Sequence, residues 1–282
     1  MLKNVKEYLY PESLNEALDL LKKKGKSARV VGGGLDIIWR SPKSVECLID
    51  LENLGLSYIE EDEKRIKIGA KTTIGEAQKS LVVGKLFKGK LTKVFSEIAT
   101  PIIRNVISFG GSVARNYPWS DITAILLTLD ASLVIFTGEE KEMKLSEFMR
   151  VEIEEFLDEA IIKEVRIDKF DPSYHFSYIR FTRTSADIPL LDEGMLLKFD
   201  KEKKVEDAIV VIGARPFGPI RMEDVEDFLL GKTLTDEVIG KAKELVMETV
   251  KVADDMRISG DYRRELSGVL TNRNLMSIRE EI

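Results

Sequence analysis

The pattern of apolar and polar residues along the first third of the chain predicts short strands and capped helices. Ser13 and Glu16 form a capping box, and the apolar residues that follow share one helical face, which ends at Gly25. Thr73 and Glu76 begin a second capped helix in the same way. Short apolar runs bounded by polar or turn residues are typical of strands. The strands expected here are residues 28–31, residues 46–51, and a hairpin of residues 58–59 and 65–68.

Farther along the chain, strands precede a group of helices. A short helix is expected over residues 94–99. It ends at Thr100 and Pro101, because the residue before a proline avoids the α region. Ser120 is a natural N-cap for a helix over residues 121–129. The other expected strands are residues 132–136, 160–167, 174–182, 194–199 and 208–212, the last three antiparallel. The other expected helices are residues 222–230, 236–256 and 261–270. This order indicates an α+β fold rather than a doubly wound sheet.

Composition excludes several classes of function. The 282 residues carry a net charge of -6, which argues against nucleic acid as a partner. Cys47 is the single cysteine and is expected to be a buried structural thiol, so the chain alone holds no disulfide and no Cys-ligated cluster. His175 is the single histidine and lacks the partners of a zinc site or a hydrolytic triad. Charged residues make up 33%, rich in Lys and Glu, which favours surface ion-pair networks.

No apolar leader follows Met1, and the longest apolar run, residues 122–136, is broken by Asp130 and is too short for a membrane span. The sequence therefore predicts a cytoplasmic protein without a membrane span.

Two glycine clusters are the strongest candidates for a binding site. We call residues 32–34 the first glycine segment and residues 110–111 the second glycine segment. A backbone without Cβ atoms can approach a ligand closely and direct several N–H groups at one point, so two such loops suggest a diphosphate held from both sides, as in a dinucleotide. A Rossmann fingerprint does not fit, because its third glycine would fall at Ile37. On this interpretation, Gly33→Val or Gly110→Val should abolish retention of the dinucleotide and leave the fold largely intact.

The residues around both segments carry a longer pattern. The first segment continues as G-G-G-L-D-I (32–37), and the second lies in I-R-N-V-I-S-F-G-G-S-V-A (103–114), followed by S-D-I-T-A-I-L-L-T-L-D-A (120–131). Two further runs are Y-I-R-F-T-R-T-S-A-D-I (178–188) and Y-R-R-E-L with V-L-T-N-R (262–273). Together these resemble the FAD-binding subunit of the xanthine dehydrogenase and carbon monoxide dehydrogenase family, over nearly the whole chain and in the same order.

The resemblance implies a fold and a domain order. It implies a two-subdomain FAD-binding fold (vanillyl-alcohol-oxidase/MurB-like, PCMH-type), followed by a C-terminal domain of a three-stranded antiparallel sheet with a helix cluster. We expect an FAD-binding region at residues 1–170, with subdomains 1–84 and 85–170, and a C-terminal flavoprotein domain at residues 171–282, joined by the polar segment 168–173.

The resemblance also implies the positions that bind FAD. They are Gly32, Gly33, Gly34, Leu35, Asp36, Ser108, Phe109, Gly110, Gly111, Ser112, Ser120, Asp121, Tyr178 and Arg180. Asp121 is either a flavin or ribose ligand or simply a first-turn residue favoured by the helix dipole. Tyr178 and Arg180 would lie near the isoalloxazine ring, where the cation would raise the flavin potential. Trp39 and Trp119 are candidate anchors in the core or at a subunit interface.

The implied function is that of an electron-transfer subunit. Its partners would be a [2Fe-2S] small subunit and a molybdopterin large subunit, with NAD or another molecule as electron acceptor. Three residues depart from the family pattern: Leu35 replaces a small hydroxyl residue and removes a side-chain donor, Ile107 replaces Gly, and Ser112 replaces Asn. The backbone donors are expected to remain. Two alternatives stay open: a self-sufficient FAD-dependent oxidoreductase, and a flavin-free structural or assembly subunit.

Overall fold

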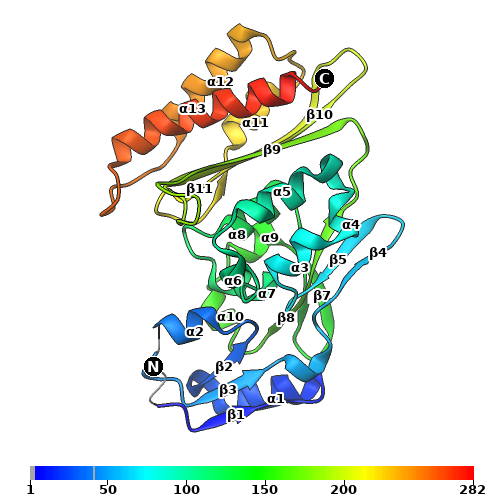
Figure 1. Cartoon of the computed structure of the whole chain (residues 1–282), viewed down its shortest axis with the longest axis vertical. Coiled ribbons are helices and arrows are strands. Elements are labelled where there is room, and N and C mark those ends of the chain that lie inside the picture. The colour runs from blue at the N-terminus through cyan, green and yellow to red at the C-terminus, as the bar shows by residue number, and fades with distance from the viewer. Residues whose placement is uncertain (1–3, 41) are drawn as a thin grey trace. The chain divides into compact units, whose positions relative to one another are not determined.

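The computed structural model describes residues 4–40 and 42–282, and the chain divides into two compact units (Figure 1). Unit 1 consists of Met1–Val83, Thr100–Arg115 and Ala131–Asp168. Unit 2 consists of Gly84–Ala99, Asn116–Asp130 and Lys169–Ile282. The expected subdomain 85–170 is therefore divided between the two units, whereas the last crossing falls in the expected linker at residues 168–173.

The first part of unit 1 is a small parallel sheet covered by a helix. Its elements are β1 (Glu7–Leu9), α1 (Leu14–Lys24), η1 (Gly25–Ser27), β2 (Ala28–Val31), α2 (Leu35–Arg40), β3 (Cys47–Asp50) and η2 (Glu52–Leu54). The strands lie in the order β1-β3-β2 and pair in parallel. Ser13 caps α1 by accepting a hydrogen bond from the Glu16 N–H, as predicted. Leu18 of α1 and Cys47 of β3 belong to one core, which confirms the predicted buried thiol.

The second sheet of unit 1 is antiparallel throughout, in the order β4-β5-β8-β6-β7. Its strands are β4 (Ile59–Glu61), β5 (Arg65–Gly69), β6 (Ser132–Phe136), β7 (Glu140–Lys144) and β8 (Ile161–Asp168). The predicted hairpin is confirmed as β4 and β5. The edge strand β7 was not predicted, because its exposed, charged residues lack the apolar alternation of a half-buried strand.

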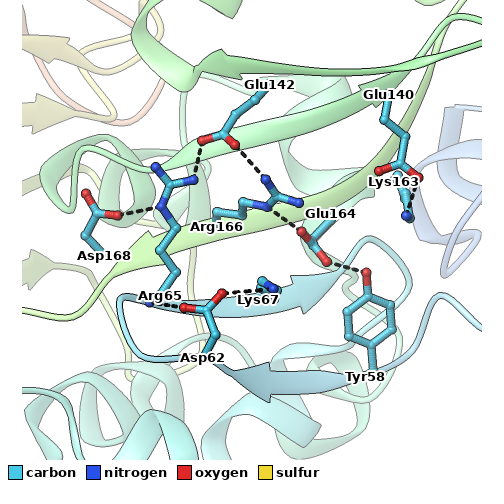
Figure 2. Close-up of polar contacts among 10 residues, drawn as sticks. All are labelled: Tyr58, Asp62, Arg65, Lys67, Glu140, Glu142, Lys163, Glu164, Arg166 and Asp168. Atoms are coloured by element: carbon cyan, nitrogen blue, oxygen red, sulfur yellow. Dashed lines mark hydrogen bonds and ion pairs between the residues drawn. The ribbon is translucent and has the colours of Figure 1, made fainter.

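A chain of ion pairs covers part of this antiparallel sheet (Figure 2). Glu142 lies 2.6 Å from both Arg65 and Arg166. Arg166 also lies 2.6 Å from Glu164, and the Tyr58 hydroxyl donates a 2.6 Å hydrogen bond to the same carboxylate. Burial and the Glu164 carboxylate together raise the pKa of Tyr58, which stays a donor. The ion-pair network predicted from the charged content is therefore present on this sheet.

Short helices complete unit 1, and one of them corrects a prediction. They are α3 (Ile74–Lys79), α6 (Pro101–Arg104), α7 (Phe109–Arg115), α9 (Leu145–Phe148) and α10 (Ile153–Phe156), and α4 (Leu81–Gly84) marks the first crossing to unit 2. Thr73 and Glu76 form the predicted capping box of α3. The second glycine segment was expected to be a loop, and this was wrong: both glycines lie inside α7. Glycine's low helix propensity concealed that helix.

Unit 2 contains one four-stranded antiparallel sheet, ordered β12-β11-β10-β9, together with several helices. Its strands are β9 (Tyr174–Phe181), β10 (Leu191–Phe199), β11 (Val205–Gly213) and β12 (Ile220–Arg221). Its helices are η3 (Leu86–Gly89), α5 (Lys90–Glu97), α8 (Asp121–Thr128), α11 (Glu223–Leu229), α12 (Asp236–Thr249) and α13 (Gly260–Arg279). Figure 1 shows α12 and α13 side by side, and α13 packs against β9 and β10. The predicted antiparallel sheet and helix cluster are confirmed.

Several boundaries in unit 2 differ from the predictions. The short strand β12 extends the predicted three-stranded sheet at its edge. Helix α5 begins and ends earlier than residues 94–99, and Ala99 adopts a left-handed φ of 46° before the Thr100 cap of α6. Helix α12 ends at Thr249, before the predicted Met256, whereas α13 continues well past Leu270. Buried polar residues on α13 obscure the apolar period that would have shown its length.

The Arg263 side chain holds the segment that connects α12 to α13. Its guanidinium is fully buried and donates hydrogen bonds to the carbonyls of Leu190, Ala253 and Ile258. It also lies 2.7 Å from Asp255. These contacts hold the connection between α12 and α13, so Arg263 has a structural role.

In the part of the chain that the structure describes, every helix is too short or too polar to cross a membrane. The same residues contain no cluster of His, Cys, Asp or Glu side chains that could hold a metal ion.

Candidate functional site

A cavity of about 390 Å³ in unit 1 is lined by residues of both glycine segments. Gly32 follows β2, and Gly110 and Gly111 begin α7. Asp36 of α2 and Arg115 at the end of α7 line the same cavity. This volume falls within the range of small-molecule sites, about 300–1,000 Å³. The structure therefore brings the two predicted segments to one concave site.

Close packing explains why both segments contain glycine. A Cβ atom at Gly33 would lie 1.7 Å from the carbonyl oxygen of Val106, and one at Gly110 would lie 2.6 Å from Ala70 Cβ. Such overlaps force the backbone to move. The expectation that Gly33→Val or Gly110→Val leaves the fold largely intact was therefore wrong. Position 34 requires glycine for a different reason, since its φ of 76° is a conformation that other residues rarely adopt.

The first segment reaches the cavity through Gly32, which lines it. Among residues 4–40 and 42–282, no hydrogen-bond acceptor is found for the N–H groups of Gly32, Gly33 and Gly34. They directly precede α2, and successive backbone N–H groups of this kind can bind an anion. This segment fits the diphosphate of a dinucleotide.

The second segment uses its N–H groups internally, which corrects the expectation that both segments donate to the ligand. The Gly110 N–H donates to the Ala70 carbonyl (2.9 Å), and the Gly111 N–H donates to Ser108 Oγ (3.3 Å). The Phe109 N–H donates to the Thr72 carbonyl. Gly110 and Gly111 line the cavity, but the space that their Cβ atoms would take is filled by Ala70 and Ser108.

Three predicted site residues support α7. Ser108 Oγ lies next to the positions that Cβ atoms of Gly32 and Gly111 would take, at 2.6 and 2.8 Å. The Ser112 hydroxyl donates to the Ser108 carbonyl (2.9 Å), so it does not replace the amide that the family has there. Phe109 is fully buried in unit 1. Ser108, Phe109 and Ser112 therefore hold the second glycine segment in place.

Asp36 and Arg115 link the elements that follow the two segments. The Arg115 guanidinium lies 2.8 Å from Asp36 and 3.3 Å from Glu154. Leu35, the first residue of α2, is partly exposed and carries no donor. Arg115 was not among the predicted site residues, because its link to Asp36 joins positions far apart in the sequence.

The remaining predicted residues gather in unit 2. Alternation along β9 places Tyr178 and Arg180 on the face that meets α8. Arg180 Nε lies 2.6 Å from Asp121 Oδ1, and its Nη2 lies 3.1 Å from Oδ2, a bidentate pair. The Tyr178 hydroxyl lies 3.5 Å from Asp121. Ser120 caps α8 by accepting from the Thr123 N–H, as predicted.

Burial has the largest effect on the pKa values of Asp121, Tyr178 and Arg180. Burial raises the pKa of Asp121, and the Arg180 guanidinium opposes that shift. Burial disfavours the charge on Arg180, but the Asp121 carboxylate outweighs it and raises the pKa of the guanidinium. Burial, then the Asp192 and Asp121 carboxylates, hold the pKa of Tyr178 well above its usual value. Asp192 lies opposite Arg180 in the β9–β10 register and was not predicted.

The chain matches two family descriptions in succession. Residues 3–169 match the FAD binding domain in molybdopterin dehydrogenase, and residues 176–278 match the CO dehydrogenase flavoprotein C-terminal domain. The chain therefore belongs to the family of FAD-binding subunits of the molybdenum hydroxylases, as the sequence motifs predicted. It is an FAD-dependent oxidoreductase subunit, and its cofactor is FAD.

Individual relatives cover nearly the whole chain. The nicotinate dehydrogenase FAD-subunit of Eubacterium barkeri is 27% identical over 277 residues, 92% of this chain and 91% of the relative. The glyceraldehyde dehydrogenase medium chain of Sulfolobus acidocaldarius is 24% identical over 272 residues, 94% of this chain and 95% of the relative. A solved structure of carbon monoxide dehydrogenase from Hydrogenophaga pseudoflava superposes with a TM-score of 0.90 at 23% identity, covering 99% of this chain and 98% of that chain. This likeness confirms the predicted fold class.

Proposed function

We propose that this chain is the electron-transfer subunit of a molybdopterin and iron–sulfur hydroxylase. Electrons would arrive from [2Fe-2S] clusters on a small subunit and pass through FAD to NAD or another acceptor. Substrate oxidation would take place on a molybdopterin large subunit. The proposal also keeps the predicted cytoplasmic location.

The observation that carries the proposal is the cavity lined by both glycine segments. Gly32 lines it, and the N–H groups of Gly32, Gly33 and Gly34 have no acceptor within the described residues. In our proposal they bind the diphosphate of FAD, and Gly110 and Gly111 form the opposite part of the cavity lining. The bound flavin would supply the redox chemistry, so the chain needs no catalytic acid or base of its own.

In unit 2, Tyr178 and Arg180 would adjust the midpoint potential of the flavin. On the family resemblance, Tyr178 and Arg180 approach the isoalloxazine ring, and we propose that role here. Because Arg180 is held by Asp121, its guanidinium would have a fixed position. Arg180→Ala should lower the flavin midpoint potential, by about 30 mV for each ~1.4 kcal/mol of lost differential stabilisation of a two-electron couple. Redox titration of the wild type, Arg180→Ala and Arg180→Lys would measure this.

The proposal that this chain assembles with other subunits rests on the names of its relatives, which are called medium chains or FAD-subunits of dehydrogenases. Affinity purification of the tagged chain from its native host, followed by mass spectrometry, tests it. We expect a ferredoxin-like chain and a large molybdopterin chain in stoichiometric amounts. A flavin-loaded protein that purifies alone and oxidises a substrate by itself would contradict the proposal and favour a self-sufficient oxidoreductase.

A further inference from the structure

The second glycine segment has no backbone N–H group left for a ligand. Its N–H groups donate to Ala70 and Ser108 inside unit 1, and the Ser112 hydroxyl donates to the Ser108 carbonyl. Leu35 adds no donor from the opposite segment. A diphosphate in the cavity would therefore meet hydrogen-bond donors from residues 32–34 and need a further donor on the α7 side.

Arg115 lies where such a donor is needed. It follows Gly111 by four residues on α7, so both lie on the same helix face, and both line the cavity. The Asp36 carboxylate lies 2.8 Å from Arg115 Nε, which orients the guanidinium from α2. The second ion pair, to Glu154, is 3.3 Å long, and the Glu154 side chain is 73% exposed. Exposed pairs of this kind contribute little, about 0–1 kcal/mol, so a ligand can displace Glu154.

We propose that Arg115 binds the diphosphate of the cofactor, held in position by Asp36. This inference rests on the proposed function and adds a residue to its site. A guanidinium is planar and presents several N–H donors in a fixed fork, which matches the geometry of a phosphate group. On this account, FAD is held between backbone donors of the first segment and a charged side chain that follows the second segment.

Arg29 offers a matched control within the same cavity. Its guanidinium donates to the carbonyls of Lys26 and Ala28 and lies 3.6 Å from Asp158. Arg29 and Arg115 both line the cavity and carry the same charge. They differ in that backbone carbonyls hold Arg29 at the edge of β2. Arg29→Gln therefore removes one charge from the cavity without removing the proposed phosphate contact.

The experiment compares ligands with and without phosphate. Full-length apoprotein of the wild type, Arg115→Gln, Arg115→Lys and Arg29→Gln is titrated with FAD and with riboflavin, followed by flavin fluorescence at several salt concentrations. Thermal unfolding of each apoprotein checks that it is folded. Loss of a charge-assisted hydrogen bond should weaken FAD binding in Arg115→Gln about tenfold or more. Riboflavin binding should change less than about twofold, Arg115→Lys should recover part of the loss, and Arg29→Gln should stay near the wild type.

Two results would overturn the inference. One is an unchanged FAD affinity in Arg115→Gln. The other is an equal loss of FAD and riboflavin, which would mean that Arg115 only ties α7 to α2. A wild-type protein that takes up no flavin would instead contradict the proposed function, and this inference with it. The salt series gives an independent check, because the FAD affinity of Arg115→Gln should depend less on salt than that of the wild type.

Discussion

At the scale of single residues, glycine is required at the positions of the site for separate physical reasons. Gly33 and Gly110 allow close backbone packing, Gly34 adopts a left-handed conformation, and Gly32 and Gly111 leave room beside Ser108. The sequence showed that two glycine clusters exist. It could not show that one cluster already uses its N–H groups, because the acceptor of the Gly110 N–H is a carbonyl of residue 70, distant in the sequence.

Substitution of Gly33 tests the packing argument. Gly33→Ala should lower the free energy of unfolding by about 1–3 kcal/mol or more, since the new Cβ overlaps the Val106 carbonyl. Gly240→Ala is the control, because a Cβ there meets no atom within 4 Å and lies in the interior of α12. We expect Gly240→Ala to match or exceed wild-type stability. Urea unfolding would measure both, and equal stability of the two variants would contradict the packing argument.

The pair of Arg180 and Asp121 gives a second residue-scale prediction. Their side chains are only 6% and 7% exposed, so removing either one leaves a buried charge without its partner. Arg180→Ala and Asp121→Ala should each cost about 3–5 kcal/mol. A double variant, Arg180→Met with Asp121→Leu, should be more stable than either single variant. Urea unfolding of the set forms the test, and additive losses would show that the two side chains are not coupled.

At the scale of helices and strands, local signals predicted the elements that have caps or buried apolar runs. Ser13, Thr73 and Ser120 cap helices as predicted, and the central strands of the sheets were found. Edge strands such as β1, β7 and β12 were missed, since they are short and polar or lie next to a proline. Their formation depends on a neighbouring strand that supplies the hydrogen bonds.

Strand β10 carries two buried acids that make stability depend on pH. Burial raises the pKa of Asp192 and of Glu193 well above the usual values. The native state therefore holds these protons to higher pH than the unfolded chain does, so the free energy of unfolding falls as pH rises above about 4. The slope is at most about 1.4 kcal/mol per pH unit for each acid.

Amide variants of these acids measure the effect. Asp192→Asn and Glu193→Gln should each flatten the fall in stability between pH 5 and pH 8, as followed by urea unfolding at a series of pH values. The exposed Asp224→Asn in the first turn of α11 serves as the control and should leave the slope unchanged. A slope that stays the same in both β10 variants would show that neither acid retains its proton in the native state.

At the scale of the whole molecule, sequence motifs predicted the family, the cofactor and the fold class. The division into units was harder to predict, because residues 84–99 and 116–130 join the C-terminal unit although they lie within the N-terminal half. The helices in these segments were assigned to the same subdomain as their neighbours in sequence, whereas the elements that they contact lie far along the chain. Helix α8, for example, packs against β10 and β11.

The most direct test of the account is the identity and amount of the cofactor. The chain is purified from its native host, denatured, and the released flavin is separated by chromatography and quantified against protein. The account predicts one FAD per chain, since the diphosphate is the part that the first glycine segment and Arg115 bind. Recovery of FMN, or of no flavin even after the apoprotein is incubated with FAD, would contradict it.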